Sequence, residues 1–303
     1  MDSQRSYVHL ILCYNNRDLF LSTEGEIKMN INKKEILIFS SLVIFTANVM
    51  WGIGYYFRMI DEGSISSVLP LIVACFIPLI TALSMCAVTK TEFATLKVKP
   101  NIIKSRKIYL LAILVGLILV YSSDLLPLFV FPKDVSIASD SKSILFFGKI
   151  VLFTVISVIE SIELLGEELG WMGYLYPRLE KEFGTFLGIV LVAVVRTLYH
   201  FVALILIAGS VNGAIIAVLS LLFNNLFLQS VLVYVTKKSD SVFPASIIHA
   251  ISNILVTLSF VTYPDGFDES IPFRVVGLIP VVIIGILFGV MLFKNEEKRE
   301  VEI

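Results

Sequence analysis

The chain has 303 residues, of which 57% are hydrophobic and only 16% charged, and its net charge is −1. Soluble globular proteins are about 45–50% apolar and about 25% charged, so this chain has an excess of apolar residues and a deficit of charge. That composition excludes a soluble globular domain, a nucleic-acid-binding protein and a disordered tail. It indicates a protein whose outer surface contacts lipid.

Eight segments are apolar and long enough to cross a bilayer, which takes about 20 residues in helical form. Helices are expected because the hydrocarbon layer offers unpaired backbone groups no partner. The segments are 35–57, 67–89, 108–131, 143–168, 184–208, 212–235, 242–263 and 275–293. We therefore predict an all-α, polytopic integral membrane protein with eight transmembrane helices.

Lys and Arg are distributed unevenly over the loops that join these segments. One side carries 18 of them and the other carries 4, while Lys149 and Arg196 fall inside segments. Cytoplasmic loops are rich in Lys and Arg, so both termini are predicted to face the cytoplasm. We expect a multi-pass protein of a cell membrane, and the Lys- and Ile-rich composition favours a bacterial plasma membrane.

The predicted organisation has three parts. Residues 1–34 form a cytoplasmic segment, residues 35–293 the membrane domain, and residues 294–303 a cytoplasmic tail. Met29 stands just before the first apolar segment, so translation from Met29 is an alternative to translation from Met1.

Ionisable side chains inside apolar segments are expensive, by about 3 kcal/mol or more, and are candidate functional residues. Such residues and one amide form a stripe on each of three segments. They are Glu160, Glu163, Glu167 and Glu168 in the fourth segment, Arg196 and His200 in the fifth, and His249 and Asn253 in the seventh. Helical spacing places most of each set on one face. We expect the three stripes to face a common buried cavity, with a solvated helix end as the alternative for Glu160 and Glu163.

Three motifs coincide with these stripes. Glu167-Glu168-Leu-Gly-Trp-Met-Gly-Tyr-Leu-Tyr-Pro177 resembles the EExxxR motif of the CAAX prenyl protease and bacteriocin-processing (CPBP, Abi) family of intramembrane glutamic proteases. Arg196-Thr-Leu-Tyr-His200 is similar to the second motif, an aromatic residue and a His four positions later. Phe243-Pro244-Ala-Ser-Ile-Ile-His249-Ala-Ile-Ser-Asn253 resembles the last motif, HxxxN. Order and spacing agree with the family over about residues 35–290.

The resemblance implies a role for each motif residue. Glu167 and His200 would activate a water molecule, Glu168 would belong to the charge network of the site, and His249 and Asn253 would donate to the oxyanion. Arg196 and Glu163 are supporting residues. The resemblance implies an intramembrane endopeptidase without cofactor or metal that cleaves a peptide or membrane-protein substrate, in bacteriocin processing or self-immunity among other contexts.

Two residues depart from the family pattern. Met172 stands where EExxxR has its Arg, and Arg196 stands where the second motif has its aromatic residue. We hypothesise that Arg196 compensates for the lost charge by pairing with Glu168 across the helix interface. For Glu167 to reach His200, the fourth helix has to continue beyond residue 168, with Pro177 marking an end or a kink.

Three alternatives stay open. The departures at Met172 and Arg196 also suit a catalytically degenerate immunity or scaffold protein on the same fold. Buried Glu and His side chains serve proton- or ion-coupled transporters as well. Glu167, His200 and His249 are also possible zinc ligands, although the sequence has no HExxH motif.

Overall fold

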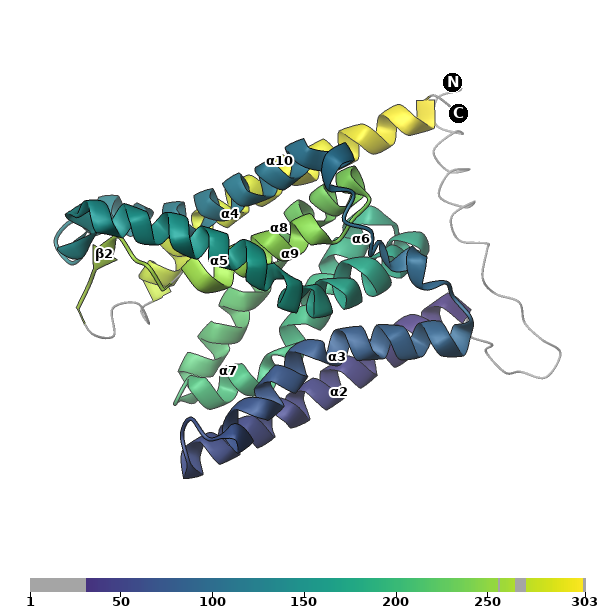
Figure 1. Ribbon diagram of the computed structural model, residues 1–303, viewed down its shortest axis with the longest axis horizontal. Coiled ribbons are helices and arrows are strands. Elements are labelled where there is room, and N and C mark those ends of the chain that lie inside the picture. The colour runs from purple at the N-terminus through teal and green to yellow at the C-terminus, as the bar shows by residue number, and fades with distance from the viewer. Residues whose placement is uncertain (1–30, 256, 265–270, 302–303) are drawn as a thin grey trace, which may run out of the picture.

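The computed structural model describes residues 31–255, 257–264 and 271–301 (Figure 1). Most of the predicted N-terminal segment, including Met29, lies outside the described residues. The described chain is all-α apart from two antiparallel strands of two residues each. The long helices are α2 (Ile31–Ile60), α3 (Ile65–Thr89), α4 (Ile102–Val130), α5 (Ile144–Glu168), α6 (Tyr176–Tyr199), α8 (Val211–Ser239) and α10 (Ile271–Val301). The shorter elements are η1 (Phe93–Leu96), β1 (Ser136–Ile137), η2 (Asp140–Lys142), η3 (Leu169–Leu175), α7 (Phe201–Ile207), α9 (Phe243–Leu255) and β2 (Val261–Thr262).

Six helices of the described residues are long and apolar enough to cross a membrane, so the chain is a multi-pass membrane protein. They are Asn32–Ile60, Ile65–Thr89, Ile102–Val130, Ile144–Tyr199, Val211–Ser239 and Ile271–Lys294. Five of them match predicted segments one to one. The remaining helix joins the predicted fourth and fifth segments, and the predicted seventh segment is not among the six. Eight spans and the orientation of the termini stay predictions.

The helical run Ile144–Tyr199 reverses its direction at Gly184. Gly184 has φ +81° and ψ 168°, a conformation that is essentially restricted to glycine. A Cβ on Gly188 would lie 3.2 Å from the backbone nitrogen of Glu180, which is impossible in a straight helix for residues eight positions apart. The second half of α6 therefore folds back on the first. As expected, the helix continues beyond Glu168, and Pro177 stands in the first turn of α6.

The predicted segment 242–263 contains a helix of only 13 residues, α9. The eight residues from Pro244 to Ile251 are all buried, and α9 packs against α4, α5 and α8. The apolar character of this segment therefore reflects burial among other helices. Composition does not distinguish this case from contact with lipid, because a helix that is apolar on all sides suits either environment. The segment then leaves the helix and reaches β2, which pairs with β1.

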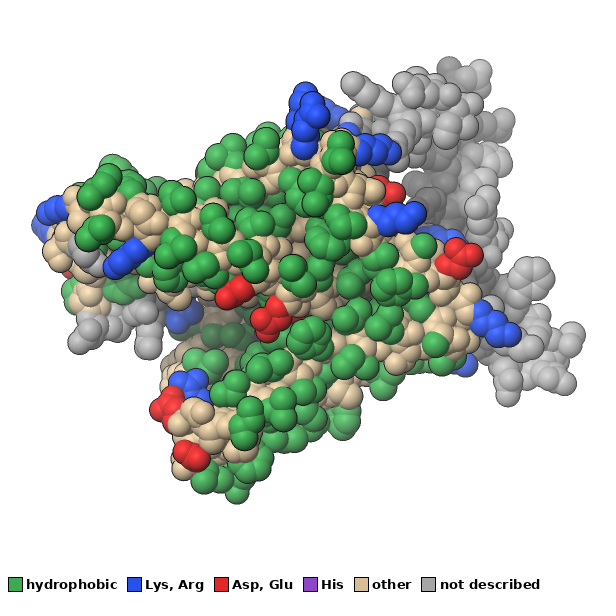
Figure 2. Space-filling view, viewed as in Figure 1, with side chains coloured by type: hydrophobic (Ala, Val, Ile, Leu, Met, Phe, Trp, Pro, Cys, Tyr) green, Lys and Arg blue, Asp and Glu red, His purple; other side chains and the backbone are tan. Residues whose placement is uncertain are grey.

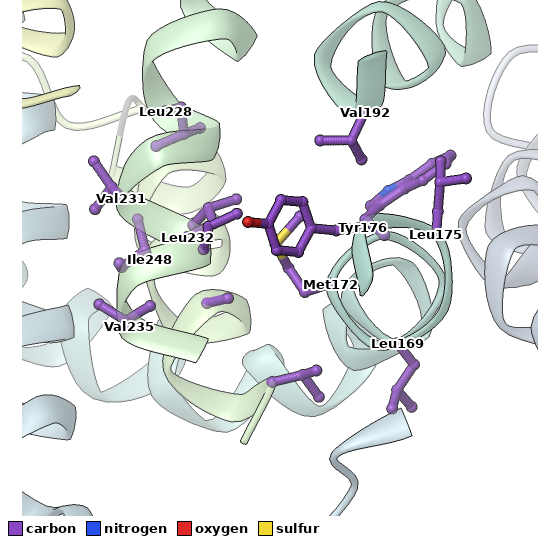
Figure 3. Close-up of a cluster of buried hydrophobic side chains, with 14 of the residues drawn as sticks. Leu169, Met172, Leu175, Tyr176, Val192, Leu228, Val231, Leu232, Val235 and Ile248 are labelled. Atoms are coloured by element: carbon purple, nitrogen blue, oxygen red, sulfur yellow. The ribbon is translucent and has the colours of Figure 1, made fainter. Parts of the chain in front are cut away.

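The helices form two groups. α2 and α3 lie side by side. α4, α5 and α8 pack around α9, and α10 lies against α4 and α8. α6 with α7 connects the two groups (Figure 1). Apolar side chains fill the interior. Met172 and Tyr176 point toward Leu228 and Leu232 of α8 in one part of it (Figure 3). The first turns of α2 and the last turns of α10 lie at the same end of the molecule (Figure 1).

Ion pairs tie the helices together at that same end. Glu180 of α6 accepts from the hydroxyls of Tyr176 and Thr185 at 2.5 and 2.8 Å, and Lys237 of α8 lies 2.5 Å from the same carboxylate. Arg178 of α6 pairs with Glu35 of α2 at 2.9 Å. These contacts fix the reversed segment of α6 against α2 and α8, and so set the direction in which α6 enters the bundle.

Candidate active site

Glu167 and Glu168 are the last two residues of α5, and both are buried, with 3% and 0% of their surface exposed. Directly after them the chain widens into the π-helix η3. π-helical turns are rare and are often found at functional sites. Gly173 allows this turn to lie against the backbone of η1, since a Cβ there would be 2.6 Å from the carbonyl oxygen of Leu96. Successive helical residues point about 100° apart, so the two carboxylates have different neighbours.

Glu168 lies in a buried group of ionisable residues that we call the Glu168 triad, formed with Arg196 and His249. Arg196 Nη2 is 3.1 Å and His249 Nδ1 is 3.0 Å from Glu168 Oε1. Arg196 Nη2 is also 3.0 Å from His249 Nδ1 and 3.2 Å from Nε2. The predicted pairing of Arg196 with Glu168 is therefore confirmed, and it links α5, α6 and α9.

Two polar contacts hold the helices of the triad in register. The hydroxyl of Ser246 on α9 donates to the backbone carbonyl of Ser161 on α5. On the other side, Asn225 Nδ2 of α8 donates to the hydroxyl of Thr197, the neighbour of Arg196, at 3.0 Å. Because each contact lies within one turn of a triad residue, it restricts sliding of the charged groups past each other.

Met172, at the position of the motif Arg, is 1% exposed. Figure 3 shows its side chain beside Tyr176, directed toward the apolar surface of α8. The charge that EExxxR would place on this helix is supplied by Arg196 from α6 instead. With both departures from the family motifs, one buried guanidinium, that of Arg196, still faces Glu168.

Glu167 lies in a different environment, which we call the Glu167 group. Trp171 Nε1 is 3.3 Å from Glu167 Oε2. Tyr199, Cys75 and His200 lie close enough to Glu167 to interact electrostatically with it. The Tyr199 hydroxyl donates to the carbonyl oxygen of Ala74 at 2.8 Å, which holds the end of α6 against α3.

His200 occupies the junction between α6 and α7. Its backbone has φ −94° and ψ 3°, outside the helical range, so the two helices are distinct elements. Its ring lies 4.5 Å from the ring of Tyr199 and 5.8 Å from the ring of Trp51 of α2, measured between centroids. Glu167, Arg196 and His249 all act on His200 electrostatically, so one residue of each of the three polar stripes lies in the neighbourhood of His200.

Asn253 is exposed and lines a cavity of about 450 Å³ between α4, α8, α9 and α10. Asp124, Asn224 and Ser252 line the same cavity. The Asp124 carboxylate accepts from the hydroxyl of Ser259 and the backbone N–H of Phe260 at 2.5 and 2.6 Å, which indicates a structural role. Asn253 thus stands one helical turn beyond His249 and opens toward a separate polar space.

Glu160 and Glu163 are exposed on α5, two turns and one turn before the buried pair, respectively. Figure 2 shows acidic side chains on the mostly apolar face over α5. Glu163 still lies near enough to Cys75 to interact with it electrostatically. The structure therefore places Glu163 at the edge of the Glu167 group, and it places Glu160 outside the buried cavity.

Sequence reasoning missed four residues of this region: Asn48, Trp51, Trp171 and Tyr199. None of them is ionised at neutral pH, so a search for charged residues in apolar segments passes over them. A search for any polar side chain inside a predicted span would have found Asn48. Among the described residues, no group of three or more His, Cys, Asp or Glu side chains is placed to hold a metal ion.

The family model described as type II CAAX prenyl endopeptidase Rce1-like matches residues 144–255. The match begins with α5 and ends with α9, so it contains both glutamates, both histidines and Asn253. No curated protein matches the chain. Residues 144–255 are therefore similar to the Rce1-like type II CAAX prenyl endopeptidases, which belong to the CPBP family of intramembrane proteases.

Proposed function

We propose that this protein is an active intramembrane endopeptidase that uses Glu167 as its general base. The observation that supports it is the division between the two buried glutamates. Glu168 is neutralised by Arg196 at 3.1 Å, whereas Glu167 has Trp171, Tyr199 and His200 as neighbours. A carboxylate with few charged partners in a poorly hydrated site has the environment that suits a general base.

In the proposed reaction, Glu167 takes a proton from a water molecule that His200 helps to hold. The water oxygen attacks the carbonyl carbon of the scissile peptide bond and forms a tetrahedral oxyanion. The C–N bond then breaks, and the proton passes from Glu167 to the leaving amine. The products are one new carboxyl group and one new amine, so no further reactant is needed.

The oxyanion requires donors at the position where its charge develops. Both ring nitrogens of His249 face Arg196, so His249 has to give up one contact in order to donate. Arg196 Nη1 is a buried donor that has no hydrogen-bond partner among the described residues. We therefore assign Arg196 Nη1 to the oxyanion, with His249 as a further donor implied by the family motif. The Asn253 amide, the third donor that the motif implies, would have to turn away from the cavity that it lines in order to reach the same oxyanion.

The family description favours a substrate with a prenylated C-terminal peptide. Bacteriocin precursors and membrane proteins are the other candidate substrates. A direct test uses the purified full chain in lipid vesicles with a farnesylated peptide ending in a CAAX sequence, and the same peptide without the lipid. We expect cleavage of the prenylated peptide by wild type, and none by Glu167→Gln or His200→Ala.

Glu160→Gln is the matched control, since it removes an exposed carboxylate of the same helix. It is expected to cleave at the wild-type rate. Full activity of Glu167→Gln, with the variant present in the membrane at normal amounts, would contradict the proposed mechanism.

One observation favours a second function. The Glu168 triad engages Glu168, Arg196 and both nitrogens of His249 with one another, which suits a protein that binds a peptide without cutting it. Such an immunity or scaffold protein would bind the peptide panel but cleave none of it. This second function would be identified if the wild-type protein binds the peptides without cleaving them and if Glu167→Gln binds them equally well.

A further inference from the structure

The helix break that presents His200 has an unusual hydrogen-bond pattern. In an unbroken helix, the N–H of Val202 would bond to the carbonyl oxygen of Leu198. Here the N–H of His200 bonds to Thr197 O at 3.1 Å, and the next helix restarts with Leu204 N bonded to His200 O at 3.0 Å. The bond between Val202 and Leu198 is replaced by contacts to another helix.

Asn48 of α2 occupies that gap. Its Nδ2 donates to Leu198 O at 2.9 Å, and its Oδ1 accepts from Val202 N at 2.7 Å. The second hydrogen of the amide goes to Ile44 O of its own helix at 2.7 Å. A primary amide has two donors and an acceptor, so this one side chain contacts both backbone groups of the missing Val202–Leu198 bond. Insertion of a side chain into the helical ladder is a recognised cause of helix kinks.

The ring of Trp51 adds a second contact from the same helix. Trp51 lies one turn after Asn48, and its ring is tilted by 44° against the His200 ring at 5.8 Å. α2 therefore restricts His200 in two ways, through the backbone on either side of it and through its imidazole. Because α2 lies outside residues 144–255, the matched domain contains neither contact.

We propose that Asn48 is a positioning residue for His200, which keeps the α6–α7 junction open and the imidazole aimed at Glu167. This inference rests on the proposed function. Removing the amide allows Val202 N to approach Leu198 O and close the helix, which rotates His200 away from its position. Misplacement of a catalytic group by about 1 Å can lower a rate about 100-fold.

The first variant is Asn48→Leu, which keeps the approximate size of the side chain and removes its hydrogen bonds. We expect kcat to fall at least about tenfold with KM changed less than about threefold, because substrate contacts are unaltered. Thr46→Val is the matched control, since the Thr46 hydroxyl donates to Leu42 O of its own helix. Thr46→Val is expected to retain the wild-type kcat.

The second variant is a rescue that packing alone does not predict. Pro lacks an N–H and disfavours a bond to residue i−4, and it is tolerated in the first turn of a helix, where Val202 stands in α7. Val202→Pro therefore enforces the break without Asn48. We expect Asn48→Leu/Val202→Pro to recover most of the lost kcat, and Val202→Pro alone to remain active.

The outcomes separate this inference from the proposed function. If Glu167→Gln abolishes cleavage while Asn48→Leu keeps the wild-type kcat, the role of Asn48 is wrong and the mechanism stands. A double variant no more active than Asn48→Leu would also overturn it. If Asn48→Leu fails to accumulate in the membrane, the test rests on the single variant Val202→Pro. Loss of cleavage activity in Val202→Pro would then contradict the proposal. Activity of Glu167→Gln would instead overturn the proposed function itself.

Discussion

Glu167 and Glu168 are neighbours in the chain, yet the structure gives them opposite surroundings. Glu168 is enclosed in the triad with a guanidinium and an imidazole, both within 3.1 Å of one oxygen. Glu167 accepts from an indole N–H at 3.3 Å and otherwise has Tyr199, a thiol and His200 in its neighbourhood. The two residues are successive positions at the end of α5 and point about 100° apart, which directs their side chains to different helices.

The two adjacent buried carboxylates are therefore suited to different roles, Glu168 to stabilising the fold and Glu167 to catalysis. Two carboxylates side by side disfavour each other's ionisation unless a cation is present. Arg196 supplies that cation to Glu168 alone, which leaves the second carboxylate available for proton transfer. We therefore expect substitutions at Glu168 to act mainly on stability, and substitutions at Glu167 to act mainly on turnover.

The largest expected effect is on the turnover of Glu167→Gln. General base catalysis contributes about 10²- to 10⁴-fold, so kcat should fall within that range. The melting temperature in detergent should change little, because the amide keeps the contact with Trp171. A lowered melting temperature with normal turnover would show that the roles of the two glutamates are reversed.

The next effect is on the stability of Arg196→Met, which removes the guanidinium partner of Glu168 and leaves that carboxylate buried beside the imidazole of His249. Breaking a buried ion pair in this way costs about 3–5 kcal/mol. The expected readout is a lower melting temperature and less protein in the membrane. Wild-type behaviour of Arg196→Met would contradict the structural role of the triad.

Arg196→Lys separates charge from hydrogen bonding at the same position. Lys keeps the ion pair with Glu168 but lacks the second guanidinium nitrogen, which we assign to the oxyanion. Removal of one oxyanion donor costs about 10²- to 10³-fold in kcat. We expect that loss in a variant that accumulates better than Arg196→Met. A normal kcat would remove Arg196 from the oxyanion site and leave it a purely structural residue.

Moving the guanidinium back to the motif position tests the compensation directly. Arg196→Phe/Met172→Arg restores the family pattern of both motifs. We expect each single substitution to lower the melting temperature more than the pair does, with a coupling of about 0.5–3 kcal/mol, the range for residues that share a network. Additive losses would show that Met172 and Arg196 changed independently.

The smallest of these effects concerns the reversal that brings Arg196 back to Glu168. Gly184→Ala forces an L-residue into a backbone conformation that costs about 1–3 kcal/mol, and should lower the melting temperature accordingly. Gly148→Ala is the control, because a Cβ at that helical position meets nothing within 4 Å. The control should be neutral or raise stability by up to about 1 kcal/mol.

The ion pair between Arg196 and Glu168 was predictable from the sequence, whereas the type and length of the helices around it were not. Arg196 shares a helix face with His200, and a buried Glu needs a cation, so spacing and electrostatics together indicated its contact with Glu168. The π-helix after Glu168 has no such signal, because Leu169–Leu175 is as apolar as an ordinary helix. Hydropathy likewise gave α9 the length of a membrane span, since burial in protein and burial in lipid select the same residues.

Asn253 and Asn48 illustrate the same limit for polar residues. The spacing of His249 and Asn253 predicts a shared face, yet the asparagine opens into the cavity beside Asp124. One face of a helix can border two different cavities. The spacing of residues along that helix does not reveal where the first cavity ends and the second begins. Asn48 acts on backbone groups 150 and 154 residues away, which only the packing of α2 on α6 and α7 reveals.

That separation along the chain has a consequence for biosynthesis. α2 is made long before Leu198 and Val202, so during insertion the Asn48 amide enters the bilayer without them. Its bond to Ile44 O already covers one of its hydrogens within the helix. The remaining donor and the oxygen stay uncovered until α6 and α7 arrive. Newly inserted α2 thus carries a polar side chain whose hydrogen-bond partners are supplied only by later helices. This favours packing of α2 against α6 and α7, around His200, as a late step of folding.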